Sequence, residues 1–140
     1  QMLRETLWNS KALSSDVTAA INPVFSSVHD PENVARLSYG LAFAKYTGSR
    51  GKVGASDADA EIMQEIRQAF EKNEVAYQVG GFNKTDEGGG GTVAKFLAYY
   101  GIRTVDAGPA LISMHSLFEI SSKADLYETY RAYKVFFGIK

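Results

Sequence analysis

Two hydrophobic periodicities alternate along this chain, and the alternation restricts its fold more than any other feature. Between residues 62 and 70, apolar side chains recur on one face of a helix, at Ile62, Ile66, Ala69 and Phe70. Directly afterwards, residues 75–79 alternate apolar and polar positions, which is typical of a strand. The same switch recurs towards the C-terminus, so the sequence predicts the α/β class, with helices packed on a central mixed sheet.

Three helices are expected. Ser56 or Asp57 can cap the first, the one that contains the 62–70 face. A second opens near Thr92, and Gly101 suits its left-handed C-terminal cap. The third begins at Ser122, and its expected apolar stripe consists of Leu126, Tyr130, Tyr133 and Phe137.

About four or five strands are expected between these helices. One is buried and ends near Asp16, and the others lie in residues 39–46, 75–79, 102–108 and, as a strand or a buried loop, 109–115. The polar segment 26–38, which contains His29, and the glycine-containing segments 47–56 and 80–91 are predicted to be surface loops. No repeat or internal linker is visible, so the chain is predicted to form one unit.

Composition excludes several functional classes. The net charge of −1 argues against a nucleic-acid partner, because proteins that bind nucleic acids present a strongly basic surface. No apolar run approaches the roughly 20 residues that span a bilayer, so no membrane partner is expected. The absence of cysteine excludes disulfides and thiolate metal sites, and it suits a cytoplasmic protein. The chain begins at Gln1 inside an apparent helix, so we expect it to be part of a longer protein.

Two side chains are candidates for chemistry. Asp16 ends the apolar segment "ALSSDVTAAI", where a carboxylate either caps a loop or serves a site at a strand end. His115 lies in the apolar run "ALISMHSLFEI", where an imidazole is costly to bury without a partner. It is therefore either a core residue with a hydrogen-bond partner or a metal ligand, and Glu119 could orient the second ring nitrogen.

Four consecutive glycines, Gly88 to Gly91, precede the second helix. Exposed amides at a helix start can hold an anion, but the spacing matches neither a phosphate loop nor a dinucleotide fingerprint. The alternatives are a tight turn, or a backbone that approaches a ligand more closely than a Cβ would allow.

Three segments, "ALSSDVTAAINP", "GGGGTVAKFLAYYGIRTVDAGPALISMHS" and "DLYETYRAYKVFF", together resemble one family. This is the aspartyl aminopeptidase and aminopeptidase I family of zinc metallopeptidases, and the bacterial aminopeptidase I branch is the most similar. The resemblance covers roughly residues 7–137. It implies that residues 1–140 are the C-terminal part of a zinc-peptidase-like (phosphorylase/hydrolase-like) catalytic domain.

The resemblance also implies residue roles. Asp16, in Ser14-Ser15-Asp16, matches a metal-binding aspartate, and His115, in the unchanged S-M-H-S motif, matches a metal-binding histidine of the other zinc ion. The residues implied to contact substrate are Lys45, Gly90, Gly91 and Thr92. No catalytic residue is expected in this chain, because the family's general-base glutamate lies upstream.

The implied activity is hydrolysis of the N-terminal residue of peptides by a water that two zinc ions activate, in a homo-oligomer. Histidines of the aspartyl branch are replaced by Ala19 and Asn22, which favours a broader or neutral substrate preference. The isolated chain is expected to be inactive and to bind zinc weakly, because it has only two ligands. Two alternatives remain: an inactive fragment, or an α/β module that binds an anion or other ligand at the Gly88–Thr92 loop.

Overall fold

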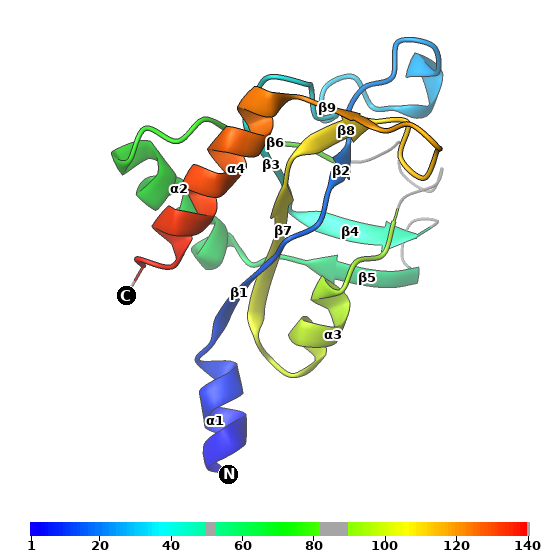
Figure 1. Cartoon of the computed structure of the whole chain (residues 1–140). Helices are drawn as coiled ribbons and strands as arrows, with labels where there is room; N and C mark the ends of the chain where they lie inside the picture. Colours follow the sequence, from blue (N-terminus) through cyan, green and yellow to red (C-terminus); the bar gives the residue numbers. More distant parts are fainter. Residues whose placement is uncertain (50–52, 82–89, 140) are drawn as a thin grey trace.

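The structure is a computed structural model that describes residues 1–49, 53–81 and 90–139 (Figure 1). The helices are α1 (Met2–Trp8), η1 (a 3-10 turn, Ser26–Val28), α2 (Ala60–Lys72), α3 (Ala94–Tyr99) and α4 (Lys123–Phe136). The strands are β1 (Lys11–Ser14), β2 (Thr18–Ala19), β3 (Leu41–Ala44), β4 (Tyr46–Ser49), β5 (Val53–Asp57), β6 (Tyr77–Val79), β7 (Arg103–Gly108), β8 (Ala110–Ile112) and β9 (Ile120–Ser121). In the part of the chain so described, no helix is both long and apolar enough to cross a membrane.

The central sheet is mixed, as the sequence predicts. Its strand order is β1-β7-β3-β6, with β7 parallel to β1 and antiparallel to β3, and with β3 parallel to β6. A small sheet, β2-β8-β9, continues from the ends of β1 and β7, and β4 and β5 form a separate hairpin. The α/β class is therefore confirmed.

The two faces of the central sheet differ in chemistry. Helices α2 and α4 cover one face, where Phe43 of β3 stacks on Phe70 of α2 with ring centroids 5.4 Å apart (Figure 1). Val105 and Ala107 of β7 belong to this apolar core. Because side chains alternate along a strand, the intervening Asp106 faces the other side, which α3 covers. A buried acid thus lies directly behind the hydrophobic core.

The first predicted helix exists, but its predicted cap is wrong. Ile62, Ile66 and Phe70 are buried, as the periodicity indicates. However, Asp59 caps α2, accepting the backbone N–H of Ile62 at 2.8 Å. Residues 56 and 57 belong to β5 instead, so the helix starts later than a capping Ser or Asp alone suggests.

The predicted stripe of α4 is also wrong in part. The helix does begin after Ser122, whose side chain caps it, but Leu126, Tyr130 and Phe137 are exposed. The buried face contains Asp125, Thr129 and Ala132. Periodicity identifies an apolar face without saying what covers it. Asp125 orients the helix instead, by accepting the backbone N–H groups of Ser38 and Gly40 at 2.7 Å each.

Two loop predictions need correction. Residues 47–56 contain the β4–β5 hairpin rather than a plain loop, which raises the strand count above the expected four or five. His29 is buried instead of exposed, although its neighbours 25–28 are exposed. Of the predicted loop 80–91, residues 82–89 lie outside the described residues.

Candidate metal centre

Asp16 lies in the turn between β1 and β2, with an exposed side chain. Its Oδ1 accepts the backbone N–H of Val17 at 2.8 Å. Within the described residues the other carboxylate oxygen has no hydrogen-bond donor, so it is available to a ligand. The predicted position of Asp16 just beyond the end of a strand is thus confirmed, since β1 ends at Ser14.

The backbone around Asp16 is held from two sides. A Cβ on Gly108 would lie 2.1 Å from the Asp16 carbonyl oxygen, so only glycine permits this approach. The Ser15 hydroxyl donates to Tyr133 Oη at 2.6 Å, and Tyr133 donates in turn to the Ala107 carbonyl at 2.7 Å. Burial raises the pKa of Tyr133, and the negative charge of Asp16 adds to the effect. The Asp16 turn is therefore fixed by neighbouring elements.

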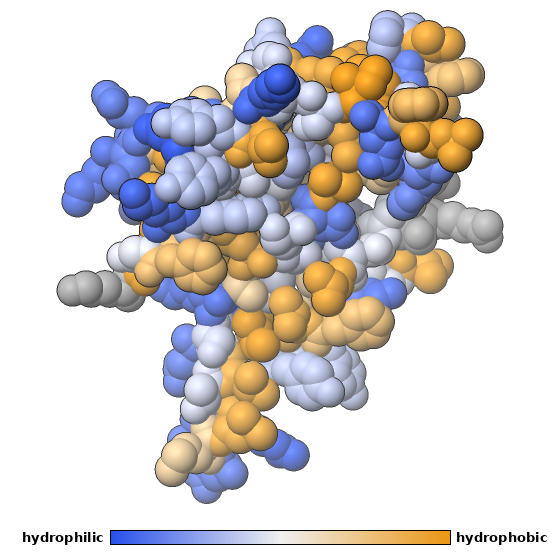
Figure 2. Space-filling view, viewed as in Figure 1, coloured by the Kyte–Doolittle hydropathy of each residue, from blue (hydrophilic) through white to orange (hydrophobic). Residues whose placement is uncertain are grey.

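His115 lies in the loop between β8 and β9, and it is exposed, not buried. Leu117 and Phe118, which follow it, are 98% and 85% exposed. Figure 2 shows hydrophobic residues gathered at this edge of the molecule, over β8, β9 and their loop. The expectation that His115 sits in a buried run is wrong, because the apolar run continues beyond β8 into the exposed loop that leads to β9.

The backbone of the S-M-H-S motif is strained. Ser113 and His115 both adopt left-handed conformations, with φ of 65° and 67°. Glu119 Oε1 accepts the backbone N–H of His115 at 2.6 Å, and the Ser116 N–H donates to the Ser113 carbonyl at 3.0 Å. Glu119 therefore fixes the backbone of His115 and does not hold its ring. Among the described residues the imidazole has no hydrogen-bond partner.

The Asp16 turn and the His115 loop lie at opposite ends of the same pair of parallel strands. Parallel pairing places Thr18 of β2 opposite Ala110 of β8. Asp16 precedes β2 by two residues, and His115 follows β8 by three. No hydrogen bond within the described residues joins their side chains, so their convergence on one cleft stays a prediction.

The other predicted site residues differ in their surroundings. Lys45 forms an ion pair with Asp57 across the hairpin and is about half exposed. A Cβ at Gly90 would meet nothing within 4 Å, and one at Gly91 would meet only ordinary contacts, so no atom of the described residues requires glycine there. Gly88 and Gly89 lie outside the described residues. The Thr92 hydroxyl points inward.

The partner of Thr92 is a residue that sequence analysis missed. Thr92 Oγ1 donates to Asp106 Oδ2 at 2.8 Å. Asp106 is only 4% exposed, and burial raises the pKa of its carboxyl group. The available signal was an acid in the middle of the apolar strand "TVDAG", which requires a polar partner if that strand is buried.

The donors present fit zinc in type but not in number. A carboxylate oxygen and an imidazole nitrogen are common zinc ligands, and bound zinc normally has at least three protein ligands. Across residues 1–49, 53–81 and 90–139, no group of three or more His, Cys, Asp or Glu side chains could hold a metal ion. A complete centre therefore needs ligands from outside these residues.

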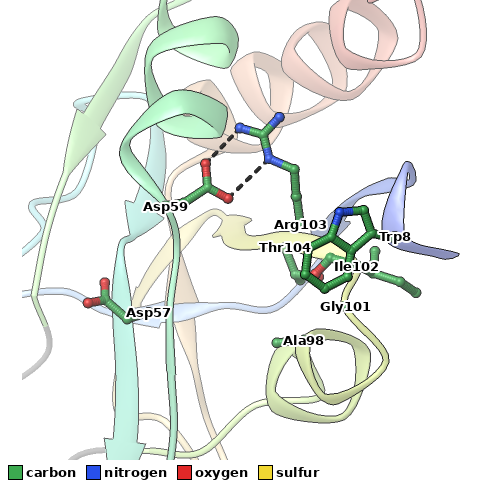
Figure 3. A pocket seen from close by; sticks show the side chains of 8 residues that line it. All are labelled: Trp8, Asp57, Asp59, Ala98, Gly101, Ile102, Arg103 and Thr104. Carbon is green, nitrogen blue, oxygen red and sulfur yellow. Dashed lines mark hydrogen bonds and ion pairs between the residues drawn. The ribbon is translucent and has the colours of Figure 1, made fainter. Parts of the chain in front are cut away.

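A cavity of about 420 Å³ lies at the other end of the sheet, between α1, α3 and β7 (Figure 3). Arg103 and Asp59 form a bidentate ion pair at its wall, with distances of 2.7 and 3.1 Å. Arg103 pairs with the first residue of β1, whereas Asp16 lies beyond the last, so this cavity is separate from the candidate centre.

Comparison with known proteins gives the family. The family model described as "Aminopeptidase I zinc metalloprotease (M18)" matches residues 1–137. A probable M18 family aminopeptidase 1 of Borrelia garinii is 62% identical over 135 residues, which are 96% of this chain and 30% of that protein. The crystal structure of an M18 aminopeptidase from Thermotoga maritima superimposes with a TM-score of 0.91 at 51% identity, covering 95% of this chain and 30% of that one.

A more distant structure shares the fold alone. The S. cerevisiae mApe1 dodecamer aligns with a TM-score of 0.74 at 23% identity, over 97% of this chain and 28% of that one. The chain thus spans about 30% of the length of the relatives it matches. The family model covers nearly all of it, and the chain belongs to the M18 family of aminopeptidase I zinc metalloproteases.

Proposed function

We propose that this chain is the C-terminal part of the catalytic domain of a zinc aminopeptidase that releases N-terminal residues from peptides. In this proposal Asp16 and His115 each hold one of two zinc ions. The family match and the exposed donor atoms of both side chains support it. The remaining ligands and the general-base glutamate are contributed by sequence outside this chain, since its relatives are about three times as long.

The observation that carries the proposal is the strained backbone of the S-M-H-S motif. Two left-handed non-glycine residues in one exposed loop cost conformational energy, and such strain is commonly retained at functional sites. The bond from the His115 N–H to Glu119 maintains that conformation. A histidine needed only for packing would not be exposed on a strained loop.

Each proposed site residue has a defined task in this proposal. Bound zinc would supply an activated water and polarise the peptide carbonyl. Asp16 offers the carboxylate oxygen that Val17 does not occupy, and His115 offers a neutral ring nitrogen. The Gly90–Thr92 segment lines the substrate side. We assign a neutral substrate side chain, because Asp57 already neutralises Lys45 and because Ala19 and Asn22 carry no charge.

We further propose that the complete protein is a homo-oligomer in the cytoplasm. The fold is shared with the S. cerevisiae protein that forms a dodecamer. The exposed Leu117 and Phe118 offer apolar surface for contacts that this chain alone does not make. A cysteine-free sequence suits the reducing cytoplasm.

The test uses the complete open reading frame that contains this chain. The purified protein is assayed on a panel of aminoacyl substrates, with and without a chelator, together with Asp16→Asn and His115→Gln. Both variants should lose zinc and at least 100-fold in kcat/KM, roughly the cost of removing a residue from a catalytic metal site. Glu5→Gln, on α1 at the far end of the molecule, is the matched control and should remain active (Figure 1).

The isolated chain provides a second test. It should show no peptidase activity and no tight zinc site by calorimetry, because it supplies one ligand to each ion. Full activity of either variant, or chelator-resistant hydrolysis, would contradict the proposal.

A further inference from the structure

Among the described residues, Asp106 is the most buried acid on the face of the central sheet that α3 covers. It pairs in register with Ser14 of β1 and with Ala44 of β3, so it lies in the interior of the sheet. Its exposed fraction is 4%, and burial raises the pKa of its carboxyl group. A carboxyl group in such a place is retained only if it interacts with other polar groups.

Hydroxyl groups surround this carboxyl. Thr92 donates to Oδ2 at 2.8 Å, and the hydroxyls of Ser14 and Thr47 lie close enough to the carboxyl to counteract the rise in its pKa. Asp106 Oδ1, Ser14 Oγ and Thr47 Oγ1 are all buried, and none has a well-formed hydrogen bond within the described residues. Incompletely satisfied groups of this kind are rare in folded proteins and require an explanation.

The hydroxyls come from three of the four segments that carry the proposed site, all except the His115 loop. Ser14 is two residues before Asp16, at the end of β1. Thr47 is two residues after Lys45, in β4, and Thr92 is itself a proposed substrate contact. One carboxyl group thus lies beside the end of β1 that leads into the Asp16 turn, beside the hairpin and beside the residues that precede α3.

We propose that Asp106 is a positioning residue, which holds the turn of Asp16 in register with the hairpin and with the Gly90–Thr92 segment. The inference rests on the proposed function, because it assigns Asp16 to zinc. Asp106 itself touches neither metal nor substrate. Its removal should release the end of β1 and reduce the preorganisation of the Asp16 carboxylate.

A second buried acid shows what a purely structural carboxylate looks like in this chain. Asp125 is fully buried, and its two oxygens accept the backbone N–H groups of Ser38 and Gly40 at 2.7 Å. Both oxygens are therefore paired with backbone, in a turn that carries no proposed site residue. Asp125→Asn is the matched control for loss of a buried charge.

The experiment measures zinc affinity of the complete protein by competition with a chelator, without substrate, and unfolding temperature alongside. Asp106→Ala should weaken zinc binding by about tenfold or more, the range typical of positioning partners of metal ligands. Asp106→Asn should restore most of that affinity, because its amide can accept from Thr92 and donate to Ser14. Asp125→Asn should lower the unfolding temperature and leave zinc affinity unchanged.

Ser14→Ala provides a variant that is expected to fold, since it removes a single hydroxyl from a buried position. It should also weaken zinc binding, and kcat should fall more than KM changes. If the Asp106 and Ser14 variants lose stability but bind zinc as tightly as the unmodified protein, the positioning role is overturned.

Failure of the proposed function gives a different result. In that case the unmodified protein binds no zinc and hydrolyses no substrate. Amide exchange on residues 14–17 would still report on the role of Asp106. Faster exchange there in Asp106→Ala than in Asp125→Asn supports it, and equal exchange refutes it.

Discussion

Tyr133 and Ser15 are joined by a hydrogen bond of 2.6 Å that connects helix α4 to the residue before Asp16. The Tyr133 hydroxyl donates to the Ala107 carbonyl of β7 at 2.7 Å. Ser14, the residue before Ser15, lies beside Asp106 on the other face of the sheet, away from Tyr133. The turn of Asp16 is therefore held from both faces, by a phenol on one and a buried carboxyl on the other.

Tyr133→Phe removes the phenol oxygen without changing the ring. The variant should lose about 2 kcal/mol of unfolding free energy, because the phenol oxygen makes two hydrogen bonds of about 1 kcal/mol each. In the complete protein it should also weaken zinc binding. Urea denaturation and chelator competition measure the two effects. Tyr130→Phe, at an exposed position of the same helix, is the control and should change neither quantity.

The same helix shows how far sequence reasoning extends. In α2 the periodic residues are buried, because the apolar face of that helix packs on the sheet. In α4 the periodic residues Leu126 and Tyr130 are exposed, whereas Asp125 is buried. No local pattern reveals that Asp125 binds the N–H groups of a turn 85 residues away. Periodicity thus predicts helices well, but their orientation depends on tertiary contacts.

In the candidate site, too, some residues can be identified from local sequence and others only from tertiary contacts. Asp16 and His115 are identifiable because the sequence around each resembles a family motif. Asp106 has no such motif, and its importance arises from segments that meet only in the folded chain. The β4–β5 hairpin was missed because its glycines indicate a loop, although its backbone pairs as strands.

Because of the Asp59–Arg103 ion pair, the free energy of unfolding should depend on pH at the acidic end of the range. Hydrogen bonding to Arg103 lowers the pKa of Asp59 to about 2. The unfolded-state value is about 3.9, so the pair stabilises the fold above pH 4, and this contribution is lost as the pH falls towards 2. The Arg103 side chain is 34% exposed and that of Asp59 is 39% exposed, so solvent screening limits the effect to about 1 kcal/mol or less.

Asp59→Asn isolates this contribution, because asparagine is an equally good helix cap. Urea denaturation at pH 7 and pH 2.5 should show the variant less stable than the unmodified chain at pH 7, with a smaller difference at pH 2.5, because a pKa of about 2 leaves Asp59 only partly protonated there. Glu5→Gln, which removes an exposed acid of α1, should follow the unmodified chain at both values. A constant difference across this range would contradict the assignment.

Gly101 permits the contact between the end of α3 and Trp8. Its φ is +81°, and a Cβ there would lie 2.7 Å from Trp8 Cε3 (Figure 3). Gly101→Ala should therefore destabilise the chain by about 1 kcal/mol for the left-handed backbone, with a further loss from the clash. Trp8 is the single tryptophan of the chain, so its fluorescence reports the displacement directly.

A double mutant separates the two costs of that substitution. In a Trp8→Ala background the clash is absent, so Gly101→Ala should then cost only the backbone strain, as urea denaturation followed by circular dichroism can measure. An equal cost in both backgrounds would show that Trp8 does not press on this glycine.

Glu119 provides the sharpest test of the strained His115 loop. Glu119→Ala removes the acceptor of the His115 N–H, a hydrogen bond of 2.6 Å to a charged group and worth about 1.5–3 kcal/mol. Exchange of the His115 amide should accelerate by at least about tenfold, and zinc binding by the complete protein should weaken. Glu119→Gln keeps an acceptor oxygen and should behave nearly as the unmodified protein. If alanine and glutamine at residue 119 have equal effects, charge rather than the backbone hydrogen bond governs the loop, and the left-handed His115 is not maintained by Glu119.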